Sequence, residues 1–266
     1  MPASILFVGD LVGGIGRRTL LGLLPGLREE HRPTFVVVNG ENAAGGLGIT
    51  PKIADELFAA GVDVITLGNH AFHRQEIFGY LDDHDAILRP YNYLRNQPGH
   101  GVCVVERDGV RLGVVNLSGN LFIRAGHPAF TTIDAALGEL RGRVDHVLVD
   151  FHAEATSEKV ALGWHLDGRV TAVVGTHTHV PTADARVLPG GTAYITDVGM
   201  TGPHDGIIGV EREPVIARFL TGLPTRFEAA KGMPKLHAVI IRADTTTGRA
   251  TSIERLSLTR AALEDM

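Results

Sequence analysis

Residues 170–180 read Val-Thr-Ala-Val-Val-Gly-Thr-His-Thr-His-Val, an apolar run that ends in a glycine and two histidines one residue apart. A short β-branched run closed by glycine predicts a strand over 170–174. Residues two apart in an extended chain project to the same side, so His177 and His179 are expected to present two imidazoles together at the strand end. Paired imidazoles in this place are typical of a metal site.

Four other apolar runs end in the same way, with side chains that can bind metal placed where a strand gives way to a loop. They are Val8-Gly9-Asp10, Val38-Asn39-Gly40-Glu41-Asn42, Leu67-Gly68-Asn69-His70 and Val149-Asp150-Phe151-His152. Strand ends on one edge of an α/β sheet converge where ligands bind. Taken singly, Asp10 fits a turn, Asn69 a helix cap and His152 a buried hydrogen-bonded side chain. Together they predict a metal centre with oxygen and nitrogen ligands and no sulfur.

The rest of the chain alternates between short apolar runs and segments of helical period, which predicts an α/β fold. Strands are expected at 4–8, 34–38, 62–67, 102–106, 111–115, 146–150, 170–174, 193–196, 236–242 and 250–257. Helices are expected from Pro51 to Gly61, from Thr131 or Thr132 to Gly142, and over 153–166. Asp108-Gly109 predicts a hairpin, so the sheets should be mixed. No linker, repeat or charge block divides the chain, and residues 1–266 are expected to form a single domain.

Composition argues against several classes of protein. The 266 residues carry 25 Lys and Arg against 30 Asp and Glu, a formal charge of -5 that offers no basic surface for bulk nucleic acid but is compatible with a small nucleotide. The one cysteine, Cys103, lies in an apolar run, so neither disulfides nor thiolate chemistry are expected. No signal-peptide pattern and no apolar segment of about 18 residues occurs, which predicts a cytoplasmic protein that does not bind membranes.

Familiar nucleotide-binding and ester-hydrolysing motifs do not fit the chain. Gly14-Ile15-Gly16 follows the first strand, but Thr19 stands where the dinucleotide fingerprint needs glycine or alanine, and no Gly-Lys-Ser/Thr occurs. No Gly-x-Ser-x-Gly elbow is found either, since Ser118 lies in Leu117-Ser118-Gly119. NAD-dependent, P-loop and serine-hydrolase chemistries are therefore disfavoured.

The order of the strand-end motifs resembles that of the calcineurin-like metallophosphoesterases, which is Asp-x-His, Gly-Asp, Gly-Asn-His-Asp/Glu, His and Gly-His-x-His. Val12 stands in place of a histidine ligand, Glu41 in place of the bridging aspartate, and Ala71 in place of the acid after Asn-His. These departures, and the runs 150–159, 175–180 and 194–202, are similar to the YmdB-type family of 2′,3′-cyclic-nucleotide 2′-phosphodiesterases. The resemblance implies a four-layer α/β/β/α sandwich with mixed sheets.

The resemblance also implies a dinuclear site that hydrolyses small phosphodiesters. One metal would take Asp10, Glu41, Asn42 and His179, and the other Glu41, Asn69, His152 and His177. A metal-bridging hydroxide would attack phosphorus and His70 would donate the proton, converting 2′,3′-cyclic nucleotides to 3′-nucleotides. Two iron or manganese ions are the expected cofactors, with zinc or magnesium as alternatives. Alternative functions are a phosphatase, phosphodiesterase or nuclease of broad specificity, with RNA as a substrate, and a metal-binding regulatory protein with little catalysis.

Several roles stay open at the level of sequence, as does assembly into a homo-oligomer. Ala71 cannot orient His70, which makes Asp197 a candidate for that role. Glu154 and Lys159 follow His152 at the opening of a predicted helix, where they face an anion or simply lie on the surface. The loops 90–100 and 121–128 are candidate walls of the cleft. Arg124 and His127 are candidate phosphate contacts, although a plain surface loop is the simpler interpretation.

Overall fold

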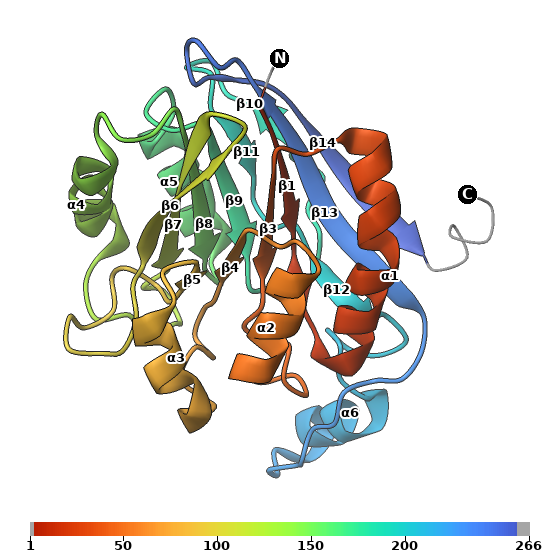
Figure 1. Ribbon diagram of the computed structural model, residues 1–266. Coiled ribbons are helices and arrows are strands. Elements are labelled where there is room, and N and C mark those ends of the chain that lie inside the picture. The colour runs from red at the N-terminus through yellow and green to blue at the C-terminus, as the bar shows by residue number, and fades with distance from the viewer. Residues whose placement is uncertain (1–2, 260–266) are drawn as a thin grey trace.

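The computed structural model describes residues 3–259, which form two mixed β-sheets (Figure 1). The first sheet has the order β2-β12-β13-β1-β3-β4-β5, with β14 paired to β13. Its strands are β1 (Ala3–Val8), β2 (Asp10–Leu11), β3 (Phe35–Asn39), β4 (Val64–Thr66), β5 (Ile87–Leu88), β12 (Met200–Pro203), β13 (Pro234–Ala243) and β14 (Ala250–Thr259). The neighbours β1, β3, β4 and β5 run parallel, whereas β13 is antiparallel to both β1 and β14.

The second sheet has the order β10-β11-β9-β8-β7-β6. Its strands are β6 (Val102–Arg107), β7 (Val110–Ser118), β8 (His146–His152), β9 (Ala172–Thr176), β10 (Arg186–Val187) and β11 (Ala193–Ile195). The predicted turn at Asp108-Gly109 joins β6 to β7, and both residues have a positive φ, 52° and 78°. Two consecutive positive φ values match the right-handed twist of a tight hairpin, which explains the Asp-Gly pair. The prediction of mixed sheets is confirmed.

Three apolar clusters separate four layers, which confirms the predicted α/β/β/α sandwich. Helices α1 (Gly13–His31), α2 (Pro51–Ala59) and α3 (Phe78–Asp83) pack on the outer face of the first sheet, next to the short 3-10 turn η1 (Gln75–Ile77). Helices α4 (Ala129–Leu140) and α5 (Thr156–His165) pack on the outer face of the second sheet. Figure 1 shows the strands between α4 and α1, with α6 (Arg212–Thr221) at one end.

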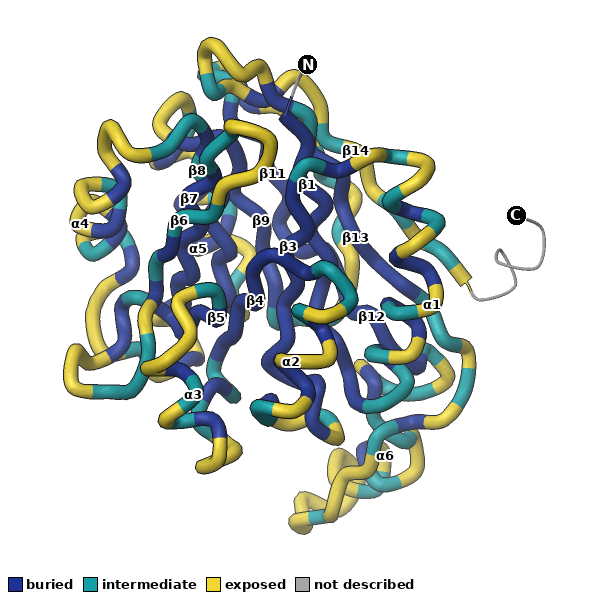
Figure 2. The backbone as a smooth tube through the Cα atoms, in the orientation of Figure 1, coloured by how far each residue is buried: buried dark blue, intermediate teal, exposed yellow. Residues whose placement is uncertain are grey.

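Strand β1 shows why its sequence is apolar without interruption. Ile5 and Phe7 point into the cluster between the two sheets, whereas Leu6 and Val8 point toward the helices. Because side chains alternate between the faces of a strand, a strand covered on both faces needs apolar residues at every position. Figure 2 shows this burial along the central strands, with exposure concentrated in the peripheral loops.

The helix starts were predicted with unequal success. Helix α2 begins at Pro51, and the Thr50 hydroxyl accepts a hydrogen bond from the Ile53 amide, as the sequence predicts. Helix α4 begins at Ala129, earlier than predicted. The hydroxyls of Thr131 and Thr132 donate to the Pro128 carbonyl within the first turn, so neither threonine is the N-cap. Helix α5 begins at Thr156, three residues later than predicted.

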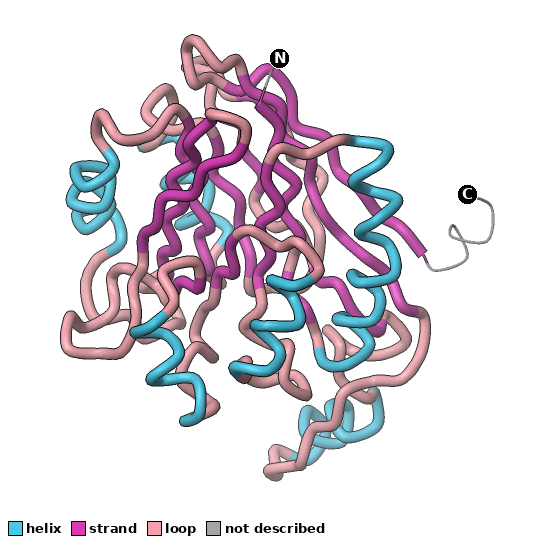
Figure 3. The backbone as a smooth tube through the Cα atoms, in the orientation of Figure 1, coloured by secondary structure: helices cyan, strands magenta, loops and turns pink. Residues whose placement is uncertain are grey.

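Several strands have their carboxyl ends at the same edge of the sandwich. Strands β1, β3 and β4 of the first sheet and β8 and β9 of the second end there, and the loops that follow them meet (Figure 3). A hydrogen bond of 3.1 Å from Asn39 in β3 to Asp150 in β8 joins the two sheets at this edge. Within residues 3–259, no helix has the length and apolarity needed to cross a membrane.

Candidate metal centre

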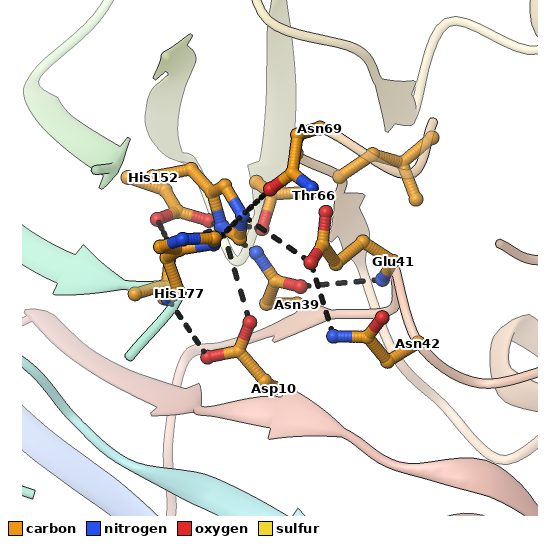
Figure 4. A network of polar contacts seen from close by, with 12 residues as sticks. Asp10, Asn39, Glu41, Asn42, Thr66, Asn69, His152 and His177 are labelled. Carbon is orange, nitrogen blue, oxygen red and sulfur yellow. Dashed lines mark hydrogen bonds and ion pairs between the residues drawn. The ribbon is translucent and has the colours of Figure 1, made fainter. Parts of the chain in front are cut away.

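The seven predicted metal ligands and His70 come together at this shared edge. Figure 4 shows most of them pointing toward one another. Asp10 lies on β2 and His152 is the last residue of β8, whereas the others lie in loops. Those loop residues are Glu41 and Asn42 after β3, Asn69 and His70 after β4, and His177 and His179 after β9.

One group of ligand atoms surrounds the ring nitrogen His152 Nε2. The oxygen Asn69 Oδ1 lies 2.9 Å from it, the nitrogen His177 Nδ1 3.1 Å, and the carboxylate oxygen Glu41 Oε1 3.2 Å. Ligand atoms of Glu41, His152 and His177 all lie within 4.8 Å of one another. Two imidazole nitrogens and a carboxylate oxygen crowded this closely are arranged as ligands of one cation.

A second group of atoms lies beside the first and shares Glu41 with it. The oxygen Asp10 Oδ1 is buried, has no hydrogen-bond partner among the described residues, and lies 4.0 Å from His179 Nε2. The amide nitrogen of Asn42 lies 3.0 Å from Glu41 Oε1 and 3.1 Å from His179 Nε2. Because this amide turns its nitrogen toward them, a metal bond through Asn42 requires the amide group to turn over.

The pKa values show that the site is built for positive charge. Burial alone would lower the pKa of His152, but Glu41 and Asp10 raise it to about 9. Burial alone would raise the pKa of Glu41, but His152 and His70 hold it well below the ordinary value. Burial raises the pKa of Asp10 to about 6, and burial together with His152 lowers that of His177 to about 3. Without metal, a protonated His152 therefore lies against an ionised Glu41, where a cation would otherwise sit.

The loop that carries His177 and His179 has an unusual backbone conformation. Both residues have positive φ, 99° and 65°, a region that costs about 1–3 kcal/mol for a residue other than glycine. Asp197 stabilises this conformation, since its Oδ2 accepts hydrogen bonds from both the amide and the hydroxyl of Thr178. The fully buried Lys159 donates to the same carboxylate at 2.7 Å and to the Thr176 carbonyl.

His70 is oriented by Asn42 and not by Asp197, so the suggestion made from the sequence is wrong. His70 Nδ1 lies 2.6 Å from Asn42 Oδ1, and the His70 amide donates to Glu41 Oε2 at 3.0 Å. Ala71, which replaces the acid of related sequences, instead packs in the core beneath the helices. Gly68, which precedes Asn69, lies against two of the ligands. A Cβ at this position would lie 2.3 Å from His152 Cδ2 and 2.4 Å from Glu41 Oε2.

Nearly the whole chain matches one known family, since the model for the YmdB-like protein family covers residues 6–256. The chain belongs to this family. A 2′,3′-cyclic-nucleotide 2′-phosphodiesterase of Bacillus subtilis (strain 168) is 50% identical to it over 252 residues, which are 95% of this chain and 96% of the relative. The family resemblance read from the strand-end motifs is thereby confirmed.

Two solved structures share both sequence and fold with this YmdB-like chain. A hypothetical protein from Thermus thermophilus is 44% identical with a TM-score of 0.90, and the match covers 96% of this chain and 99% of that one. A structure described as a novel phosphatase of Mycoplasma pneumoniae is 33% identical with a TM-score of 0.91, covering 100% of this chain and 97% of that one. The predicted fold class is therefore found in its relatives.

Glu154 and Lys159 have different roles in this YmdB-like fold, because Glu154 precedes α5 whereas Lys159 lies in its first turn and contacts the Asp197 carboxylate. Glu154 precedes α5, and its Oε2 lies 3.0 Å from His177 Nε2, on the side of the ring opposite the candidate metal. A carboxylate in this position fixes which imidazole nitrogen is free to bind metal. Lys159 is buried against Asp197, so a surface position is wrong for it and the negative charge that it faces is this carboxylate.

The loops that are candidate walls of the cleft border a cavity whose lining includes none of the proposed metal ligands. Residues of the loop 90–100 line a cavity of about 1020 Å³ together with residues of α4. Tyr93 lines this cavity, and its hydroxyl donates to the Gly68 carbonyl at 3.3 Å, next to the ligand Asn69. Arg124 and His127 are exposed, and a role for them in binding phosphate stays a prediction.

Proposed function

We propose that the chain is a metal-dependent phosphodiesterase that hydrolyses 2′,3′-cyclic nucleotides to 3′-nucleotides. The observation that carries this proposal is the cluster of Glu41, His152 and His177, beside the buried oxygen of Asp10, which has no hydrogen-bond partner within residues 3–259. The name of the 50% identical Bacillus relative supports the same substrate class. The match over residues 6–256 supports the further proposal that the chain acts as one domain.

The residues present suit two hard or borderline cations. Asp10, Glu41, Asn42 and His179 would hold one ion, and Glu41, Asn69, His152 and His177 the other. Carboxylate, amide and imidazole donors without sulfur favour iron or manganese and also accept zinc or magnesium. When bound, such ions neutralise phosphoryl oxygens and lower the pKa of a water molecule. Glu41 is the candidate bridge because its Oε1 lies 3.2 Å from His152 Nε2 in one group and 3.0 Å from the side-chain nitrogen of Asn42 in the other.

His70 is the proposed proton donor to the leaving oxygen. Its side chain is 23% exposed, so it borders solvent while its Nδ1 is tied to Asn42 Oδ1. For Asn42 to bind metal through Oδ1 its amide must turn over, and the amide nitrogen would then donate to His70 Nδ1 and orient the ring. The opposite ring nitrogen would then carry the proton that is given to the leaving oxygen. A strongly basic ribose alkoxide needs this proton, whereas a nitrophenolate does not.

The test compares substrates with and without metal. Protein loaded with Mn²⁺ or Fe²⁺ should convert 2′,3′-cyclic AMP to 3′-AMP faster than it hydrolyses p-nitrophenyl phosphate or single-stranded RNA, and chelation should abolish this turnover. Similar rates on all three substrates would favour a phosphoesterase of broad specificity. Bound metal without turnover of any substrate would favour a regulatory protein.

The variant His70→Ala tests the proton donor. It should retain its metal and lose at least about 100-fold in turnover of 2′,3′-cyclic AMP, the usual contribution of a positioned acid. It should lose much less on bis-p-nitrophenyl phosphate. His165→Ala, an exposed histidine at the end of α5, is the matched control and should behave as the parent protein. Unchanged cyclic-nucleotide turnover in metal-replete His70→Ala would remove His70 from the mechanism.

A further inference from the structure

A buried carboxylate lies beneath the metal centre and is none of its ligands. Asp150 is fully buried in β8, two residues before His152. It accepts hydrogen bonds from Asn39 Nδ2 at 3.1 Å, from Thr66 Oγ1 at 2.5 Å and from Thr176 Oγ1 at 2.7 Å. Three donors offset the cost of burying the charge, and they come from both sheets.

Each strand held by this carboxylate leads directly to a proposed ligand. Asn39 ends β3 two residues before Glu41, and Thr66 ends β4 three residues before Asn69. Thr176 ends β9 one residue before His177. Figure 4 shows Asn39 and Thr66 among the ligands. Asp150 therefore joins the strand ends of the two sheets at the point where their ligands must meet.

The direction of the hydrogen bonds connects Asp150 to the ring of His152. Thr176 has a single hydroxyl proton, and at 2.7 Å from a carboxylate oxygen that proton is donated to Asp150. The hydroxyl oxygen must then accept from His152 Nδ1, which lies 2.9 Å away. His152 Nδ1 consequently carries a hydrogen whether or not the ring is charged, so Nε2, which faces Glu41, Asn69 and His177, is the nitrogen that would bind the cation.

We propose that Asp150 is a positioning residue which acts through Thr176 to fix the orientation and tautomer of His152. The proposal rests on the proposed metal site, in which His152 is a ligand. The chain Asp150, Thr176, His152 performs the task that a direct carboxylate partner performs for other metal-binding histidines. Thr66 and Asn39 bind the same carboxylate without touching the ring, so their contribution is confined to holding the two sheets together.

Two isosteric variants separate positioning from mere packing. Thr176→Val and Thr66→Val each remove one hydrogen bond to Asp150, but only Thr176 contacts His152. Loss of a partner that orients a metal-binding histidine typically lowers metal affinity 10–100-fold. Zinc affinity, measured by competition with a chromophoric chelator, should therefore fall about 10–100-fold in Thr176→Val and less than about threefold in Thr66→Val. Thr176→Ser should restore the parent affinity.

A second readout does not depend on affinity or turnover. In zinc-loaded protein with labelled histidine nitrogens, the Nδ1 hydrogen of His152 should be protected from exchange in the parent and in Thr66→Val, and exposed to exchange in Thr176→Val. Thermal unfolding checks that each variant folds, and Thr176→Ala tests the same bond without added bulk if the valine variant does not fold.

The outcomes distinguish this inference from the proposed function. Parent-like affinity and protection in Thr176→Val overturn the positioning role and leave the metal site intact. Equal losses in Thr176→Val and Thr66→Val also overturn it, because they would show a carboxylate that only ties the sheets together. A parent protein that binds no metal at His152 overturns both the inference and the proposed function.

Discussion

Replacing Lys159 with methionine tests how strongly the ligand loop depends on one buried ion pair. Lys159 and Asp197 are each 1% exposed and lie 2.7 Å apart. Methionine retains most of the side-chain volume but leaves the Asp197 charge buried without its cation, a change that typically costs about 3–5 kcal/mol. Asp197 keeps its hydrogen bonds from Thr178 and Gly199, so the lower end, about 3 kcal/mol, is expected.

The measurement is thermal and urea unfolding of the chelated protein. In a chain slightly shorter than this one, each kcal/mol of lost stability lowers Tm by about 2–4 °C, so Lys159→Met should lower Tm by about 6–12 °C. Adding Asp197→Asn removes the stranded charge and should restore part of the loss. The surface pair of Arg111 and Asp145, 2.9 Å apart, is the control, and Arg111→Met should lower Tm much less than Lys159→Met does. A loss in Lys159→Met no larger than in this control would refute the reasoning.

Two further predictions follow from the ligand geometry. Gly68→Ala should abolish tight metal binding and destabilise the protein by about 1–3 kcal/mol, because its Cβ would overlap His152 and Glu41. Gly79→Ala is the control, since Gly79 has open space around it, and metal titration and unfolding should give values near those of the parent. The chelated protein should lose about 3 kcal/mol of stability as the pH rises, because folding raises the pKa of His152 to about 9. The stability that the protonated ring contributes is fully present below pH 6.5 and is lost as the pH passes about 9. Urea unfolding across this range should show the loss in the parent and a flatter profile in His152→Asn, and a parent profile that stays level contradicts the assignment.

Much of the fold and the metal centre could be predicted because the signals are local. A β-branched run closed by glycine and followed by Asp, Asn, Glu or His is visible within ten residues, and parallel strands bring such endings to one edge. That reasoning placed Glu41, Asn69, His152 and His177 where the structure brings them together. Helix starts were harder, because the threonines of α4 have the chemistry of caps but bond within the first turn.

The sequence by itself determined which side chains lie at the strand ends and the order in which they occur. Only the tertiary structure decided what holds them there. Asp150 reads as one more strand residue, yet it bonds to Asn39, which is 111 positions away, and Asp197 meets Lys159 across 38 positions. The first bond depends on how the two sheets face each other and the second on how α5 packs against the second sheet, and no local pattern encodes either relation. Once water is excluded, each buried charge must have a partner, and the packed sheets determine which residue is near enough to serve.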